Sequence, residues 1–180
     1  MTSPKAHVPA CAASDAAAHF DATFLAHWQT IYRALCRLVG DASEAEDLAL
    51  ETFWRLHQRA PSTEQNLGGW LYRVAMNLGL NALRARQRRV RHELAAGKWE
   101  LENATADPEH AVIAADERAR MRAVLSEMSE REAHLLILRY SGMAYQEIAR
   151  TLGVSPNSVG TLLARAEREF EKRFRQKEEG

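Results

Sequence analysis

Residues 143–165 constrain the fold more than any other stretch, because they predict two short helices separated by a fixed turn. Apolar residues recur at helical spacing in the first of them: Tyr145, Ile148, Ala149 and Leu152. Gly153 follows, and glycine tolerates the positive φ that often ends a helix. Ser155 offers an N-cap oxygen, and Pro156 suits the first helical position, where its missing N–H costs nothing.

This pattern is typical of a helix-turn-helix, whose second helix lies in the major groove of DNA with its first residues at the base edges. An ordinary helical hairpin is the alternative, because glycine at a helix end is common. The stretch therefore favours DNA binding and leaves the hairpin open.

The composition favours helices and argues against a DNA-binding protein that acts alone. Hydrophobic residues make up 46% of the chain and aromatic residues 7%, with only 9 glycines and 5 prolines. Basic and acidic residues both number 24, so the chain lacks the positive charge from which autonomous DNA affinity comes. Cys11 and Cys36 form no metal-ligand or redox motif, which suits a reducing cytoplasm.

Two helices are predicted in the first part of the chain, at 20–39 and from Ser43, where Glu46 completes a capping box. The apolar stripe expected in the second helix consists of Ala45, Leu48, Thr52 and Leu56. Its other side is acidic, with Glu44, Glu46, Asp47 and Glu51. Two interpretations stay open for this side: a solvated helix start stabilised by the helix dipole, or a docking face for a basic partner.

A loop at 60–69 precedes a long helix that begins at Trp70. Its expected buried stripe consists of Leu71, Val74, Ala75, Leu78 and Ala82. From residue 66 to residue 92 there are six arginines and no acidic residue, which favours a phosphate-facing surface. Trp70 and Tyr72 offer flat faces on which unstacked bases stack for about 1–3 kcal/mol each. For Trp70, core packing is the stronger alternative.

The charge inverts at 93–117, where seven acidic residues accompany a single lysine and Pro108 breaks any helix. We interpret this stretch as a flexible acidic linker, which also shields the basic helix in the free protein. The prediction is an all-α chain of two small helical domains: a disordered tail at 1–18, a first domain at 19–92, the linker at 93–117 and a second domain at 118–180. The second domain is expected to hold four helices, one of them opened by a capping box of Ser129 and Glu132.

No enzyme signature is present in the sequence. The seven histidines are scattered and none stands at metal-site spacing, and there is no phosphate-binding glycine loop or nucleophile elbow. We expect no catalytic residue, no metal and no cofactor. No apolar run is long enough to span a membrane and the start of the chain is no signal peptide, so a cytoplasmic protein is expected.

Three stretches in order resemble the sigma-70 family of RNA polymerase sigma factors, of the extracytoplasmic-function type that keeps only regions 2 and 4. EAEDLALETFWRLH resembles the region 2 motif that docks on the clamp helices of the polymerase β′ subunit. GGWLYRVAMNLGLNALRARQRR resembles the part of region 2 that captures unstacked minus-10 bases, and residues 125–169 resemble region 4, which reads the minus-35 element. The resemblance implies promoter-specific transcription initiation with core RNA polymerase (β′ and β subunits) and promoter DNA as partners.

The resemblance also implies roles for particular residues. The residues to which it gives a role in binding core polymerase are Asp47, Leu50, Glu51 and Phe53. Binding of the minus-10 strand falls on Trp70, Arg73, Asn77, Asn81, Arg84 and Arg88, with the loop 61–69 holding a flipped base. Binding of the minus-35 duplex falls on Pro156, Asn157, Ser158, Thr161 and Arg165. Family members often have an anti-sigma factor, although no residue here requires one.

The sequence departs from the family pattern at two places. Leu50 stands where the family usually has glutamine, and 159–163 reads VGTLL where the recognition helix typically reads VKSRL. Because a bidentate arginine–guanine contact contributes about 1–3 kcal/mol of discrimination, weaker or unusual minus-35 reading is expected. The main alternative to a sigma factor is a helix-turn-helix regulator that acts without polymerase; a helical adaptor that binds no DNA is a second.

Overall fold

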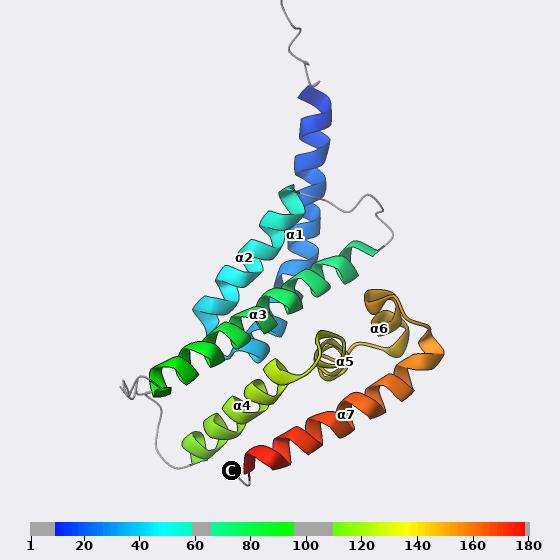
Figure 1. Cartoon of the computed structure of the whole chain (residues 1–180). Coiled ribbons are helices and arrows are strands. Elements are labelled where there is room, and N and C mark those ends of the chain that lie inside the picture. The colour runs from blue at the N-terminus through cyan, green and yellow to red at the C-terminus, as the bar shows by residue number, and fades with distance from the viewer. Residues whose placement is uncertain (1–9, 59–65, 96–109, 179–180) are drawn as a thin grey trace, which may run out of the picture.

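The computed structural model describes residues 10–58, 66–95 and 110–178, and within these ranges the chain is helical and contains no strand. The seven helices are α1 (Ala10–Val39), α2 (Ala42–Gln58), α3 (Leu67–Ala95), α4 (His110–Glu127), α5 (Glu130–Tyr140), α6 (Tyr145–Leu152) and α7 (Pro156–Glu178). Helices α1, α2 and α3 form one bundle, and α4–α7 lie along one side of α3 (Figure 1). The predicted all-α class is confirmed, and the described ranges contain three helices before residues 96–109 and four after them.

The first bundle is held by an apolar core that includes a group of aromatic rings. Ile31, Leu35 and Leu38 of α1 are buried against residues of α2 and α3. The ring of Phe53, from α2, lies 4.8 Å from that of Phe24 and 5.9 Å from that of Trp28, measured between centroids. These rings fix α2 against α1 and thereby determine which side of α2 faces outward.

The helix starts in this bundle differ from those predicted. Helix α2 begins at Ala42, and Asp41 caps it by accepting a hydrogen bond from the Glu44 N–H (2.7 Å), so the predicted cap at Ser43 is wrong. Helix α3 begins at Leu67, three residues before the predicted start. Asn66 caps this helix by accepting from the Gly69 N–H (3.1 Å), and a Cβ at Gly69 would lie 2.5 Å from the Asn66 side chain. A side chain at position 69 would therefore displace the cap.

The second bundle contains the predicted helix-turn-helix, with a helix stop at Gly153 and a helix start at Pro156. Gly153 ends α6 with φ of 65°, in the left-handed region that favours glycine, and α7 begins at Pro156. Ser129 caps α5 by accepting from the Glu132 N–H (3.3 Å), as the capping box predicts, and its hydroxyl donates to the Glu132 carboxylate (2.7 Å). The sequence signals of this bundle thus act locally, as expected.

Replacing Gly160 with alanine is expected to raise the free energy of unfolding by about 0.5–1 kcal/mol, because glycine is a poor residue inside a helix. The added Cβ would lie 3.7 Å from Tyr145 Cε2, an ordinary van der Waals contact. Urea unfolding of the two proteins measures the difference. Gly153→Ala is the matched control: its positive φ makes alanine unfavourable, so that variant should lose stability. A loss at position 160 as well would contradict the prediction.

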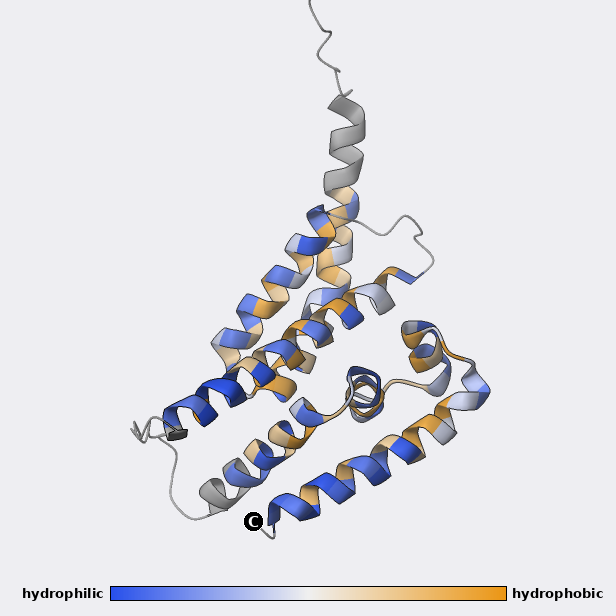
Figure 2. Cartoon of the chain, viewed as in Figure 1, coloured by the Kyte–Doolittle hydropathy of each residue, from blue (hydrophilic) through white to orange (hydrophobic). Residues whose placement is uncertain are grey.

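The two bundles contact each other along α3, which packs against α4, α5 and α6. Both ends of the predicted linker 93–117 are helical, because α3 continues to Ala95 and α4 begins at His110, while residues 96–109 lie outside the described ranges. Helix α1 begins at Ala10, so the second half of the stretch 1–18, predicted as a disordered tail, is helical. Hydrophilic residues gather in the second half of α3 (Figure 2). None of the helices in the described ranges is both long and apolar enough to cross a membrane.

Candidate nucleic-acid and partner interfaces

One side of α2 combines carboxylates with exposed apolar side chains. Asp47, Leu50, Glu51 and Trp54 follow one another at helical spacing and so lie on one side of the helix, which we call the α2 face. Leu50 is 49% exposed and Trp54 55%, so neither is a core residue, and the two form an apolar strip one helical turn apart. Glu51 is paired with Arg55 at 2.8 Å, within the same helix.

Phe53 does not belong to the α2 face, although the resemblance implies a role for it in polymerase docking. Its side chain is only 2% exposed and packs among the rings of α1, so it offers no surface to a partner in this structure. The exposed aromatic residue is its neighbour Trp54, to which the resemblance gives no role. Helical spacing separates the two aromatic residues. Phe53 lies four residues after Ala49, which is buried, and Trp54 lies four residues after Leu50, which is exposed.

The residues predicted to bind the minus-10 strand share one sector of α3 but differ in accessibility. Arg73, Asn81 and Arg88 are exposed, while Trp70 and Asn77 are half-buried and Trp70 packs against the core. Tyr72 is 2% exposed, so its proposed stacking on bases is wrong for this structure. Of the predicted buried stripe, Leu71 and Ala75 are buried, whereas Val74, Leu78 and Ala82 are half-buried. The hydrophobic side chains buried beside Leu71 and Ala75 are instead Tyr72, Met76, Leu80 and Leu83.

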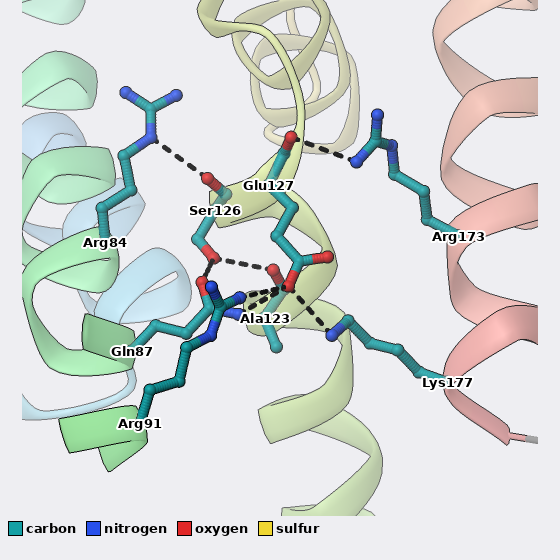
Figure 3. A network of polar contacts seen from close by, with 8 residues as sticks. All are labelled: Arg84, Gln87, Arg91, Ala123, Ser126, Glu127, Arg173 and Lys177. Atoms are coloured by element: carbon teal, nitrogen blue, oxygen red, sulfur yellow. Dashed lines mark hydrogen bonds and ion pairs between the residues drawn. The ribbon is translucent and has the colours of Figure 1, made fainter. Parts of the chain in front are cut away.

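Arg84, the remaining residue of that set, is bound by the junction between α4 and α5 (Figure 3). Its Nε donates to the carbonyl oxygen of Ser126 (3.1 Å) and a terminal nitrogen donates to that of Met128 (3.2 Å). The other terminal nitrogen donates to the Glu130 carboxylate (3.2 Å). A cation at the C-terminal end of α4 satisfies carbonyls that have no partner within the helix and complements its dipole.

Glu127, the last residue of α4, collects donors from two other helices (Figure 3). Its Oε1 accepts from Gln87 (2.6 Å) and Arg91 (3.1 Å) of α3 and from Lys177 (3.0 Å) of α7. Burial acts to raise the pKa of Glu127, but hydrogen bonds from Lys177 and Gln87 and the charges of Lys177 and Arg91 outweigh it and lower the pKa. Glu127 is therefore held ionised between the two bundles.

Lowering the pH is expected to destabilise the fold through His134 of α5, which is 7% exposed. Burial lowers the pKa of His134; Glu130 on its own helix opposes the shift, and Arg84 and Arg73 of α3 reinforce it. The unfolded chain then binds the proton more readily, so this contribution to stability is complete above the unfolded pKa of about 6.5 and is lost as the pH falls below it.

The measurement is the urea midpoint at pH 7.5 and at pH 5.5 for the wild type, His134→Gln and a control, His57→Gln, whose histidine is exposed. His134→Gln should reduce the loss at pH 5.5, and the control should retain it. An equal loss in all three proteins would exclude His134 as the cause.

The start of α7 is open to a ligand. Pro156, Asn157, Ser158 and Thr161 are exposed, and Arg165 is 77% exposed, with its Nε 3.8 Å from Glu132. Leu162 stands where the family typically has a basic residue, and it is half-buried against the core. The first turns of α7 therefore present polar groups and backbone but little positive charge.

No group of three or more His, Cys, Asp or Glu side chains in the described ranges is arranged to hold a metal ion. What the geometry does present is a helical protein of two bundles with a helix-turn-helix in one, an arginine-rich helix in the other, and a mixed acidic and apolar face beside it. These three surfaces are the candidates for contact with nucleic acid and with a protein partner.

Comparison with known families identifies the class. Residues 23–89 match the family model described as "Sigma-70 region 2", and residues 118–170 match the model described as "Sigma-70, region 4". The chain therefore belongs to the sigma-70 family, and several of its curated relatives are named ECF RNA polymerase sigma factors.

The ECF RNA polymerase sigma factor SigE of Mycolicibacterium smegmatis is 34% identical over 146 residues, which cover 79% of this chain and 55% of that protein. The RNA polymerase sigma-H factor of Pseudomonas aeruginosa is 28% identical over 85% of this chain and 84% of its own length. Thus the chain spans about half the length of the first relative and most of the second. A solved structure, the sigma factor RpoE in complex with the anti-sigma factor NepR from Bartonella quintana, has the same fold, with a TM-score of 0.52, 19% identity and 87% of this chain and 97% of that chain covered.

Proposed function

We propose that this chain is a sigma factor that binds core RNA polymerase and directs promoter-specific initiation, without catalysis of its own. In this proposal the α2 face docks on the β′ clamp helices, α3 holds the melted minus-10 strand and the start of α7 reads the minus-35 duplex. The partners are core RNA polymerase, including its β subunit, and promoter DNA. The protein acts in the cytoplasm. An anti-sigma factor is a further possible partner.

The observation that carries the proposal is the α2 face. A regulator that acts alone needs a DNA-binding surface but no exposed leucine and tryptophan beside carboxylates, whereas Leu50 and Trp54 are both about half exposed there. The neutral net charge is consistent with this proposal, because polymerase contributes to the affinity of the complex for DNA and this chain does not need to supply all of it.

The test is co-purification of the full chain with bacterial core RNA polymerase, followed by run-off transcription from a library of genomic fragments. Retention together with new start sites is expected, and the start sites would reveal the promoter sequence. Binding to promoter DNA without retention on polymerase would instead support the stand-alone regulator.

A further inference from the structure

Three arginines gather where the end of α1 meets α3 and α4, two helices that lie side by side (Figure 1). Arg118 and Arg122 are one turn apart on α4, and Arg86 lies on α3 next to Gln87, which bonds to α4. The guanidinium group of Arg122 lies against Gly40, the residue that follows α1, because a Cβ added at Gly40 would be 2.7 Å from one of its nitrogens. We call Arg86, Arg118 and Arg122 the arginine cluster.

The arginine cluster carries three positive charges, and none of its members forms an ion pair within the described ranges. Asp41, next to Gly40, uses its carboxylate to cap α2. Burial lowers the pKa of Arg122, and the charges of Arg86 and Arg118 lower it further. No carboxylate in the described part of the chain opposes this shift. The three cations therefore repel one another in the free protein.

The dipole of α1 accounts for only part of this arrangement. The C-terminal end of a helix carries about half a negative charge, which favours a single cation placed there, and Arg122 takes that place. Arg86 and Arg118 add two further charges that the helix end does not offset. A multiply charged anion bound among the three would offset them.

The chemistry of the arginine cluster favours an anion with several phosphates. A guanidinium group donates two parallel hydrogen bonds to a phosphate, so neighbouring guanidinium groups suit neighbouring phosphates. A single carboxylate would leave two of the three cations without a partner. A DNA duplex is disfavoured, because Arg122 is half-buried between exposed Arg86 and Arg118 and is more accessible to a small anion than to a continuous backbone.

We propose that the arginine cluster binds an oligophosphate anion, either free or as the phosphate chain of a nucleotide. Because Arg86 belongs to the first bundle and Arg118 and Arg122 to the second, the bound anion joins the two bundles and stabilises the folded chain. The cluster includes no residue of the α2 face or of the start of α7, so this site is independent of the proposed function.

The test compares the full-length wild type with two variants of equal net charge. The site variant carries Arg86→Gln and Arg118→Gln, one change in each bundle and both at exposed positions. The control carries Arg33→Gln and Arg131→Gln, which are likewise exposed and divided between the bundles. Equal net charge keeps the general attraction to anions the same in the two variants.

Three measurements are made in a magnesium-free buffer of fixed ionic strength. Isothermal titration calorimetry gives the affinities for tripolyphosphate, ATP and AMP. Nitrogen-15 NMR spectra follow the backbone amide of Gly40, which lies against Arg122. Fluorescence anisotropy of a fluorescein-labelled duplex of random sequence, with and without tripolyphosphate, reports competition with DNA.

Tripolyphosphate should bind the wild type and the control equally and the site variant about tenfold or more weakly, because charge-assisted hydrogen bonds are lost. The Gly40 signal should shift on binding in the wild type and the control. ATP should bind more tightly than AMP. Tighter binding of ATP than of tripolyphosphate would identify a nucleotide as the ligand, and equal affinities would identify the phosphate chain alone.

Equal affinities of the site variant and the control, or no binding of tripolyphosphate to the wild type, would overturn the proposal. A duplex that binds the site variant more weakly than the control, and that tripolyphosphate does not displace, would assign the arginine cluster to nucleic acid instead.

A structural role of the arginines is tested by urea unfolding without any anion. The midpoint of the site variant should equal or exceed that of the control, because the repulsion around Arg122 is relieved. A lower midpoint would show that Arg86 and Arg118 stabilise the fold directly and would overturn the proposal. Failure of the proposed function would appear only as a lack of retention on core polymerase and would leave these results unchanged.

Discussion

Phe53→Ala is expected to lower the free energy of unfolding by about 3–5 kcal/mol, the usual cost of removing a buried phenylalanine. The side chain is 2% exposed and contacts the rings of Phe24 and Trp28, so the truncation leaves a cavity at the junction of α1 and α2. Urea unfolding followed by circular dichroism measures the loss.

Trp54→Ala is the matched control for that variant, because it changes the neighbouring aromatic residue, which is 55% exposed. Its stability should stay within about 1 kcal/mol of the wild type, while its affinity for core polymerase should fall about thirtyfold or more, as for a tryptophan at the centre of an interface. The opposite result, with Phe53→Ala folded but unable to bind polymerase and Trp54→Ala still binding it, would assign polymerase docking to Phe53 and not to Trp54.

Phe53 and Trp54 differ in the side of α2 that each occupies, and the sequence contains a signal for this difference. The family motif marks an aromatic position, but it does not say which side of the helix faces the core. The spacing of Ala45, Ala49, Thr52 and Leu56, all buried, places Phe53 with them on a helical wheel. The inward position of Phe53 could therefore have been predicted from periodicity alone.

Local signals predicted the second bundle well because each acts over a few residues. Gly153, Pro156 and the pair of Ser129 with Glu132 have the conformations or contacts expected of them. A cap or a stop depends on backbone groups within one turn, so it can be predicted without knowledge of the tertiary fold.

The contact between the bundles could not be predicted in this way. Arg84 and Ser126 are 42 residues apart, and on sequence alone Arg84 is one of six arginines in an acid-free stretch. A charged residue that binds DNA and one that binds a distant carboxylate have the same local pattern. Only the placement of α4 beside α3 brings Arg84 to the carbonyl oxygen of Ser126 and Arg91 to the carboxylate of Glu127.

The double variant Asp47→Lys, Glu51→Lys is expected to abolish binding to core polymerase, a loss of at least about a hundredfold, because like charges placed across an interface cost several kcal/mol. Asp47 is exposed and Glu51 half-exposed, so neither lysine is forced into the core, and the pair of Glu51 with Arg55 contributes only about 0.3–0.5 kcal/mol to stability. The fold should therefore survive. Pull-down and titration with labelled core enzyme measure the affinity, and Asp116→Lys, Glu117→Lys is the control of equal charge on α4. Unchanged binding in the α2 variant would exclude the α2 face as the docking surface. Equal losses of affinity in the α2 variant and the α4 control would show that net charge alone causes the effect.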